Sequence, residues 1–306
     1  PPVTFLPRVR MWEQGRRELV FARSYDGGEK ALTELVESLE EMLSPCTLCP
    51  RECGVDRLAG EIGFCGVGAE AKIASAGPHF GEESPLVGHG GSGTIFLSGC
   101  NLGCVYCQND DISHGRMGRV VSASDLANTM LSLQSRGCQN INFVTPTHQT
   151  PVIVKAIVGA MKEGLDLPIV YNCGGYEKLE VVQKLQSIVD IYMPDLKYAT
   201  DSFGDKYSVA PDYWSHSREA IKEMYRQVGD LSLNDEGIAT SGLLVRHLVL
   251  PNNLAGTKEV LEFLASLSTE TFVNIMGQYR PCYEASRYEE LSRRPTREEM
   301  NEAFSL

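Results

Sequence analysis

Three cysteines, Cys100, Cys104 and Cys107, fall within eight consecutive positions of the stretch "SGCNLGCVYCQND". One disulfide would leave the third thiol unpaired, and a tetrahedral zinc ion would lack its fourth ligand. Three thiolates on one short loop can instead ligate three irons of a [4Fe–4S] cluster, which leaves the fourth iron open to another ligand. The spacing therefore predicts an iron–sulfur site that the polypeptide alone does not complete.

A second cysteine group lies nearer the N-terminus, in "CTLCPRECGVDRLAGEIGFCG". Its members, Cys46, Cys49, Cys53 and Cys65, form the pattern C-x2-C-x3-C-x11-C, and four thiols can complete a closed structural metal site. The glycine-containing loop before Cys65 is typical of a hairpin that returns the last ligand to a mononuclear zinc or iron ion. A second [4Fe–4S] cluster that serves electron transfer is the alternative, and free cysteines are the third possibility.

Composition and charge narrow the class of protein. The chain has 306 residues and ten cysteines without the hydrophobic region of a secretory signal, so we expect metal or redox chemistry in the cytoplasm rather than a disulfide framework. No apolar run reaches the roughly 18 residues that span a bilayer, which predicts no membrane segment. The formal net charge of −12 argues against nucleic acid as a partner, because an acidic surface repels phosphates.

From residue 93 onward, short apolar segments alternate with amphipathic ones. The apolar segments predict six strands, at residues 93–99, 140–145, 167–172, 188–194, 242–251 and 272–278. Helical patterns lie between them, near residues 123–136, 151–163, 176–186, 211–228 and 257–267. Such alternation indicates right-handed, parallel β–α–β units. The sequence thus predicts an α/β fold, a partial (β/α)6 TIM-like barrel, with its chemistry at the carboxyl ends of the strands, where the cysteine loop begins.

The whole chain divides into four expected segments. They are a helical lead-in at residues 1–45, a loop-dominated cysteine-rich metal-binding segment at 46–92, the barrel at 93–282 and a helical tail at 283–306. In the tail, the spacing predicts Thr296 as the N-cap of a helix and Glu299 at its third position, as in a capping box. The tail covers either the barrel or the surface of a partner.

Five motifs, taken with the cysteine spacing, resemble the radical S-adenosylmethionine (SAM) superfamily, and within it the branch related to pyruvate formate-lyase activating enzyme. They are "GCNLGCVYCQNDDIS", "INFVTPTHQTPVIVKAI", "LPIVYNCGGYE", "VDIYMPDLKY" and "VRHLVLPNN", and the resemblance covers roughly residues 46–282. It implies that the open iron of the [4Fe–4S] cluster binds the amino and carboxylate groups of SAM. One electron then cleaves SAM to methionine and a 5′-deoxyadenosyl radical, which abstracts a hydrogen atom.

The resemblance also implies partners. They are a reductant such as flavodoxin or ferredoxin, and a polypeptide substrate, for example a glycyl residue of a partner enzyme. A small molecule or a peptide side chain is the alternative substrate for the same chemistry. An iron–sulfur electron carrier without a substrate is the alternative of a different class, and formation of 5′-deoxyadenosine separates it from the enzymes.

Candidate SAM-binding residues lie on the cysteine loop and after the second strand. Tyr106, directly before the last cysteine, can shield the cluster from water. Thr145, Thr147 and His148 stand where many members of the superfamily carry a Gly-Gly-Glu-like motif for the methionine ammonium, so the resemblance implies that role for them. This sequence lacks the motif itself, and His148 can instead bind a substrate or satisfy a local backbone group.

Further candidates lie at the ends of the third and fourth strands and within the fifth. The resemblance implies that Asn172 lies near the methionine carboxylate and the ribose, and that Arg246 binds the carboxylate, a task that suits its forked guanidinium. Asp195 and Lys197 lie two residues apart and share a face of an extended chain. Similar pairs in activating enzymes lie beside SAM, so we expect Asp195 to bind ribose, ammonium or a cation.

Residues at other strand ends have less specific signals. After the sixth strand, the resemblance implies that Gln278 or Tyr279 lies near the adenine. Cys173 could relay a thiyl radical, but a small cysteine on an apolar strand is expected in the packed core. His247 lies on the face of its strand opposite to Arg246 and is expected to pack between the barrel and its helices.

Overall fold

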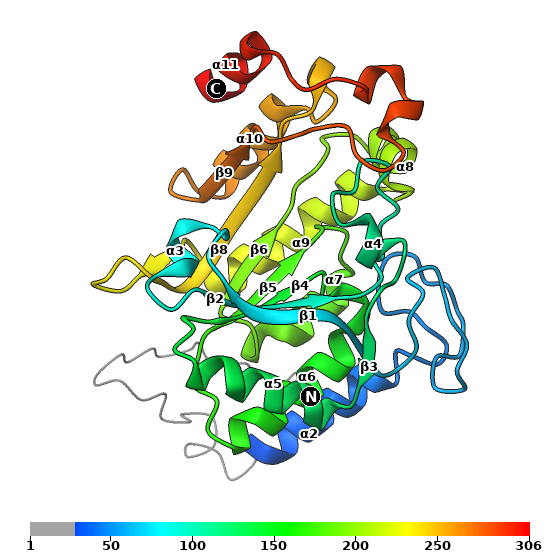
Figure 1. Ribbon diagram of the computed structural model, residues 1–306, viewed down its shortest axis with the longest axis vertical. Coiled ribbons are helices and arrows are strands. Elements are labelled where there is room, and N and C mark those ends of the chain that lie inside the picture. Colours follow the sequence, from blue (N-terminus) through cyan, green and yellow to red (C-terminus); the bar gives the residue numbers. More distant parts are fainter. Residues whose placement is uncertain (1–27) are drawn as a thin grey trace.

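A computed structural model describes residues 28–306 and shows how their strands and helices are arranged (Figure 1). Six strands pair in parallel and in chain order: β2 (Ser92–Leu97), β4 (Ile141–Val144), β5 (Ile169–Cys173), β6 (Ile191–Pro194), β8 (Ala239–Leu248) and β9 (Phe272–Met276). Each coincides with one of the six predicted strands. Within the described residues β9 does not pair with β2, so the barrel is open on that side. The prediction of a partial (β/α)6 barrel is confirmed.

Helices in the connections cover the outer face of the sheet (Figure 1). The longer ones are α5 (Ala123–Ser135), α6 (Thr150–Lys162), α9 (Tyr213–Val228) and α10 (Thr257–Leu267), and the short helix α7 (Leu179–Lys184) connects β5 and β6. The lead-in contributes α2 (Gly28–Glu40), which packs against α6, while the rest of that prediction, residues 1–27, lies outside the described residues. None of the helices in residues 28–306 has the length and apolarity that a membrane crossing requires.

Shorter helical turns join these elements. They are α3 (Ser84–Val87), α4 (Asp110–Ser113), α8 (Asp201–Ser208) and the 3-10 turns η1 (Thr147–Gln149), η2 (Leu185–Ser187), η3 (Pro251–Asn253), η4 (Ala285–Arg287) and η5 (Glu289–Leu291). The tail forms α11 (Arg297–Ser305), and the predicted capping box between Thr296 and Glu299 is present. Glu299 also accepts a hydrogen bond of 2.7 Å from the backbone N–H of Asn252, so the tail is attached to the turn after β8.

Strand β1 (Ala71–His79) is a regular element that the sequence analysis did not predict, in a segment, residues 46–92, that is otherwise mostly loop as expected. It pairs antiparallel with β2, and β3 (Arg119–Val121) pairs with its first three residues, Ala71–Ile73. The stretch "AKIASAGPH" lacks a regular alternation of large apolar and polar residues and contains glycine and proline, which are poor strand formers. It is extended because the edge of β2 offers partners for its backbone groups. The short strand β7 (Ser232–Leu233) pairs with β8.

Side-chain alternation gives the sheet an outer apolar face and an inner face that carries the polar residues. On β5, Tyr171 and Cys173 belong to the main core, which the helices cover. A separate inner cluster consists of Leu86, Val170, Ile191, Met193, Ala239 and Leu244. Asn172 and Arg246 follow two residues after members of this cluster, so they lie on the same inner face, nearer the carboxyl ends of their strands.

Candidate active site

The cysteine loop follows β2 directly and is held by backbone hydrogen bonds to α8. The N–H of Val105 donates to the carbonyl oxygen of Tyr207 over 2.9 Å, and that of Gly103 donates to the carbonyl oxygen of Ser208 over 2.7 Å. A Cβ atom at Gly103 would lie 3.0 Å from a methyl group of Val209, which is closer than most side chains tolerate. The loop with its three cysteines is therefore tightly fitted between β2 and α8.

Each thiol of the loop has a hydrogen-bonding group near its sulfur. The three pairs are Leu102 N–H with Cys100 Sγ at 3.3 Å, Ser208 Oγ with Cys104 Sγ at 3.0 Å, and Ser113 Oγ with Cys107 Sγ at 3.1 Å. Hydrogen bonds to sulfur stabilise thiolates and tune the potential of iron–sulfur clusters. The loop thus offers three cysteine ligands with the surroundings that a cluster needs.

The thiols of the loop are close enough to affect one another's ionisation. Burial raises the pKa of Cys100, and the charges of Cys104 and Cys107 raise it further. Burial also raises the pKa of Cys104, against the opposing charge of Lys197. Within residues 28–306, no three His, Cys, Asp or Glu side chains are arranged to hold a single metal ion. Three cysteines on one loop can each ligate a different iron of a [4Fe–4S] cluster.

Tyr106 closes the buried side of the cysteine loop. Its hydroxyl lies 2.6 Å from the hydroxyl of Tyr198, which in turn lies 2.8 Å from Ser208 Oγ, the group beside Cys104. Its ring packs edge-on against Tyr279, with 5.7 Å between the ring centres. Only 5% of Tyr106 is exposed. The side chain therefore lies where it can keep water from the cysteines.

The second cysteine group lies beside the first. Burial raises the pKa of Cys49 to about 12, and the charges of the other three thiols of its group raise it further. The four sulfurs are therefore gathered, although they do not form a single-ion site, as stated above for the described residues. A Cβ atom at Gly99, directly before Cys100, would overlap the carbonyl oxygen of Cys65. Glycine at this position lets the two cysteine groups come into backbone contact.

Arg51, which the sequence analysis missed, lies between the two cysteine groups. Its guanidinium donates to the carbonyl oxygen of Asn101 and stacks on Phe64, 3.4 Å from the ring centre. Burial lowers the pKa of Arg51, and the charges of Cys49 and Cys100 act in the opposite direction. One cation thus faces a cysteine of each group. Its position between Cys49 and Cys53 of the second cysteine group is the signal that could have identified it.

Four of the predicted residues come together at the carboxyl ends of β5, β6 and β8. Lys197 Nζ lies 2.6 Å from Asp195 Oδ2, Arg246 Nε lies 2.8 Å from Asp195 Oδ1, and Arg246 Nη2 donates to Asn172 Oδ1 over 2.7 Å. Burial disfavours the charged form of Asp195, but the charges of Arg246 and Lys197 outweigh it and hold the pKa of Asp195 below its usual value. Because Lys197 also lowers the pKa of Cys104, this polar cluster adjoins the cysteine loop.

Two glutamates that the sequence analysis missed, Glu82 and Glu83, extend this polar cluster. Glu82 Oε1 lies 3.4 Å from Arg246 Nη1, and Glu82 Oε2 accepts a hydrogen bond of 2.9 Å from Asn142. Glu83 accepts hydrogen bonds of 2.9 and 2.8 Å from Asn274 of β9. Arg246 therefore already faces carboxylates of the protein itself. The contact of Arg246 with Glu82 is longer than its contacts with Asp195 and Asn172.

The predicted residues after β4 occupy different surroundings. Thr145 adjoins the polar cluster, because its N–H donates to the carbonyl oxygen of Asn172 over 2.8 Å. His148 is buried, with Nε2 2.8 Å from the carbonyl oxygen of Ser98, and burial lowers its pKa to about 4. His148 is thus uncharged at neutral pH and contacts a backbone carbonyl just before the cysteine loop. Among its three possible roles, this contact favours the local backbone role.

Thr147 donates to a buried carboxylate that the sequence analysis missed. Its hydroxyl lies 2.6 Å from Glu177 Oε1, and the hydroxyl of Tyr171 lies 3.1 Å from Glu177 Oε2. Burial raises the pKa of Glu177 to about 7, although Thr147, Tyr171 and Cys173 donate hydrogen bonds to it. Cys173 is itself buried in the main core, as predicted. The glutamate lies close behind the polar residues of β5, in the motif "CGGYE".

The free energy of unfolding will decrease less between pH 5 and pH 8 in a Glu177→Gln variant than in the natural chain. The folded protein raises the pKa of Glu177 from 4.5 to about 7, so stability that is present below pH 4.5 is lost as the pH rises through 7. The shift corresponds to about 3 kcal/mol of unfolding free energy, and the glutamine variant does not lose this contribution as the pH rises. Urea unfolding at pH 5 and pH 8 measures the difference. Glu180→Gln, an exposed carboxylate of α7, is the control, and equal pH slopes for Glu177→Gln and the natural chain would contradict the prediction.

The remaining predicted residues lie away from the polar cluster. Gln278 is exposed beyond the end of β9, so its contact with adenine stays a prediction. Tyr279 is fully buried, and its hydroxyl donates to the carbonyl oxygen of Leu291 over 2.7 Å. His247 is also buried, and its Nε2 lies 3.0 Å from the hydroxyl of Thr257 at the start of α10. The prediction that His247 packs between the barrel and its helices is confirmed.

Comparisons with known proteins agree with this geometry. The family model described as the Radical SAM superfamily matches residues 94–275. A protein of Methanocaldococcus jannaschii, described as uncharacterized protein MJ0674, is 31% identical over 281 residues, which cover 89% of this chain and 76% of that protein.

Solved structures give weaker matches. Streptococcus suis SuiB bound to precursor peptide SuiA has 10% identity over 68% of this chain and 42% of that chain, with a TM-score of 0.46. HydG, a maturase of the [FeFe]-hydrogenase, has 11% identity over 90% of this chain and 60% of that chain, also with a TM-score of 0.46. The chain thus spans between 42% and 60% of the length of these two proteins.

Proposed function

Because this chain belongs to the radical SAM superfamily of enzymes, we propose that it uses a radical derived from SAM to abstract a hydrogen atom from a polypeptide. When bound, a [4Fe–4S] cluster supplies the electron that converts SAM to methionine and the 5′-deoxyadenosyl radical. Cys100, Cys104 and Cys107 would hold the cluster. The observation that carries the proposal is the incomplete set of three thiols on one loop beside a buried polar cluster.

The residues of the polar cluster would bind and orient SAM. Asp195 is kept ionised by Arg246 and Lys197, so its carboxylate can accept hydrogen bonds from the ammonium or the ribose hydroxyls of SAM. The guanidinium of Arg246 would bind the carboxylate of SAM after it releases Glu82. Asn172, which contacts Arg246, would fix the direction of that guanidinium. Tyr106 would exclude water from the cysteine side of the site.

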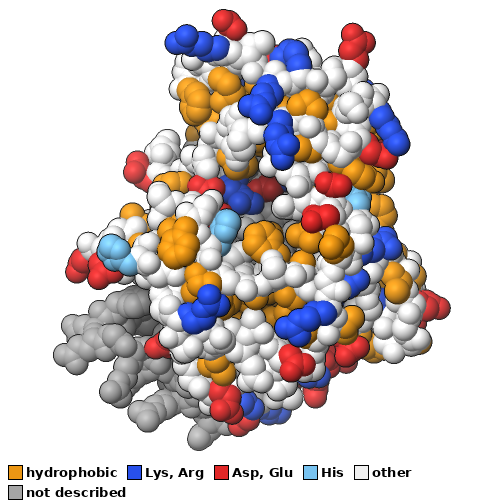
Figure 2. Space-filling view, viewed as in Figure 1, with side chains coloured by type: hydrophobic (Ala, Val, Ile, Leu, Met, Phe, Trp, Pro, Cys, Tyr) orange, Lys and Arg blue, Asp and Glu red, His pale blue; other side chains and the backbone are white. Residues whose placement is uncertain are grey.

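The open side of the barrel supports a polypeptide as the substrate. Every residue of β9 is half-buried, and within the described residues no strand pairs with its outer edge. Figure 2 shows a hollow on the viewed face, with basic and acidic side chains at its bottom. An opening of this kind can admit an extended segment of a large partner, such as the glycyl loop that an activating enzyme requires.

The second cysteine group is proposed to hold an iron–sulfur cluster rather than a single zinc or iron ion. Its four thiols lie close enough together for their charges to raise the pKa of Cys49 and of Cys65. Its backbone contact with Gly99 and the shared cation Arg51 support electron transfer toward the first cluster. A reductant such as flavodoxin or ferredoxin would supply the electrons.

The decisive experiment follows deuterium from the substrate into 5′-deoxyadenosine. The full chain is reconstituted anaerobically and reduced in the presence of SAM. An extract of cells grown on deuterated amino acids is separated into a macromolecular and a small-molecule fraction, and each fraction is added to the enzyme separately. We expect 5′-deoxyadenosine to form, and to carry deuterium with the macromolecular fraction alone. Cys104→Ala should form none. Deuterium from the small-molecule fraction would refute the polypeptide, and no 5′-deoxyadenosine at all would indicate an electron carrier.

A further inference from the structure

Part of one edge of strand β1 pairs with no other strand of the described residues. β3 pairs with Ala71–Ile73 and ends there. Among the described residues, positions 74–79 of β1 therefore have β2 as a neighbouring strand on one side and no strand on the other. Ser75 and Ala76 are exposed, and their side chains are small. Unpaired backbone groups on a strand edge can bind an additional extended chain.

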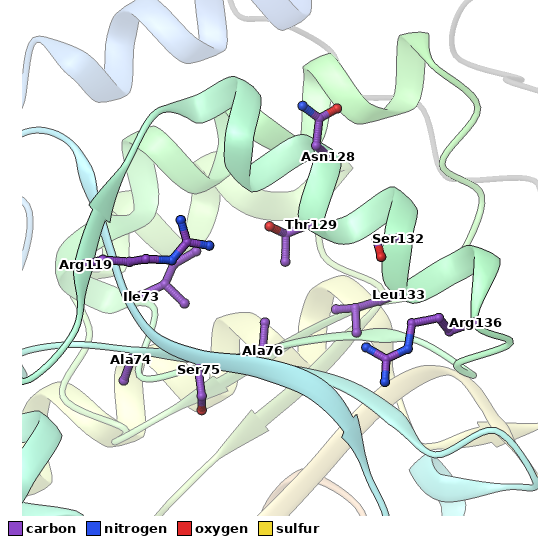
Figure 3. Close-up of a pocket in the computed structure, with 10 residues that line it drawn as sticks. All are labelled: Ile73, Ala74, Ser75, Ala76, Arg119, Asn128, Thr129, Ser132, Leu133 and Arg136. Carbon is purple, nitrogen blue, oxygen red and sulfur yellow. The ribbon is translucent and has the colours of Figure 1, made fainter.

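A groove of about 380 Å³ runs along this edge, between β1 and α5 (Figure 3). One wall is the edge itself, from Ile73 to Ala76, and the other is formed by the residues of α5 that face it, Asn128, Thr129, Ser132 and Leu133. Arg119 and Arg136 stand at its two ends, and Figure 3 shows both guanidinium groups pointing into the space between the strand and the helix. The groove combines a strand edge, side-chain hydroxyls and two cations.

The two arginines have no fixed acidic partner. Within residues 28–306 neither guanidinium takes part in a hydrogen bond or an ion pair, and the residues that line the groove include no aspartate or glutamate. Asp125 lies near Arg119, but its carboxylate is engaged with Ser122 in the capping box of α5. Two arginines without an acidic partner at one groove favour an acidic occupant by charge complementarity.

From this geometry we propose that the groove binds an acidic peptide segment in extended conformation, as an added strand along residues 74–79 of β1. The two strands that pair with β1, β2 and β3, are both antiparallel to it. A bound segment that is also antiparallel to β1 would have its C-terminal end beside Arg119, which pairs with Ile73. Side chains of glutamate or aspartate, or a free carboxylate, then meet the two guanidinium groups. The role of the groove in recognising a polypeptide substrate rests on the proposed function, whereas the binding of an acidic segment to the groove does not.

The experiment uses the reconstituted full chain and a short fluorescent probe that alternates valine with glutamate and ends in a free carboxylate. We expect the probe to bind and a version with lysine in place of glutamate to bind at least about tenfold more weakly. The backbone N–H groups of residues 74–79 that face the free edge of β1 should become protected from hydrogen exchange. Arg119→Glu/Arg136→Glu should weaken binding of the acidic probe at least about tenfold. Arg297→Glu, the same charge change on an exposed residue of α11, should leave it unchanged.

Formation of 5′-deoxyadenosine separates this proposal from the proposed function. The groove variants should form it at the rate of the natural chain when no polypeptide is added, because neither arginine belongs to the polar cluster. If the natural chain forms 5′-deoxyadenosine but the acidic probe does not bind, or binds without protecting the β1 amides, the groove proposal is wrong. Competition by inorganic phosphate alone, without amide protection, would likewise overturn it and indicate a site for a small anion.

Discussion

An Arg246→Gln variant will form 5′-deoxyadenosine at limiting SAM at least about a hundredfold more slowly than the natural chain. The guanidinium contacts Asp195 and Asn172 at 2.8 and 2.7 Å, and it is the group of the polar cluster best suited to bind a carboxylate. Glutamine has neither the charge nor the forked pair of donors. The loss should be greatest in the apparent KM for SAM, which a steady-state assay with varied SAM measures.

Stability will fall in the same variant, and a second substitution separates the two effects. Arg246 is the cation paired with Glu82 within the described residues, and removing one partner of a buried pair costs about 3–5 kcal/mol. Asp195 keeps Lys197 at 2.6 Å. We therefore expect Arg246→Gln/Glu82→Gln to recover most of the unfolding free energy while SAM cleavage stays impaired.

A surface arginine provides the matched control. Arg287 contacts Glu284 at 2.7 Å, and both side chains of this pair are accessible to solvent, so Arg287→Gln should cost less than about 1 kcal/mol and leave SAM cleavage unchanged. If Arg246→Gln binds SAM as tightly as the natural chain, the carboxylate of SAM is held elsewhere. Arg246 would then be a structural partner of Asp195 and Glu82 rather than part of the binding site.

The fold was predictable where strands and helices carry their own hydrophobic pattern. The six parallel strands are apolar runs, and the tail helix has the side chains of its own capping box, so both are visible locally. β1 is different, since its nine residues contain three alanines, a glycine and a proline and gain their extended conformation from β2. A strand whose extended conformation depends on pairing with another strand need not show an alternating hydrophobic pattern of its own.

The active site was predictable to the extent that it depends on strand ends. Asn172 and Arg246 lie near the carboxyl ends of apolar strands, Asp195 directly follows one, and the three meet because parallel strands bring their carboxyl ends to one edge. Glu82 was missed because its partner Arg246 lies 164 positions away and no local motif surrounds it. Glu177 was missed for a different reason, since its raised pKa results from burial that only the packed structure reveals.

The two cysteine groups pose one question about electron transfer. Gly99 and Arg51 bring the closed group of four thiols next to the open group of three, and a cation shared by both would stabilise negative charge on either side. A zinc ion has no redox chemistry and would make this contact purely structural. An iron–sulfur cluster would make it a path for the electron that SAM cleavage consumes.

Cys46→Ala/Cys49→Ala will lose the iron and sulfide of the second site and most of its soluble yield. Metal binding contributes directly to folding when the ligands are gathered from a segment with little regular structure, as residues 46–70 are. Cys49 and Cys46 are both buried, so an empty site also leaves their surroundings unsupported. Iron, zinc and acid-labile sulfide per chain, with 5′-deoxyadenosine formed per remaining cluster, measure the result. We expect equal losses of iron and sulfide, and a smaller effect on SAM cleavage than on yield when a strong chemical reductant replaces the protein donor.

Cys138→Ala is the control, because Cys138 is a buried cysteine outside both groups and should leave metal content unchanged. Loss of zinc without loss of sulfide would assign a single zinc ion to the second site and remove it from electron transfer. Clean folding with unchanged metal content would exclude any metal at these four cysteines. With flavodoxin as the donor, a much larger loss of SAM cleavage than with the chemical reductant would place the second cluster on the electron path, because only the protein donor then depends on it.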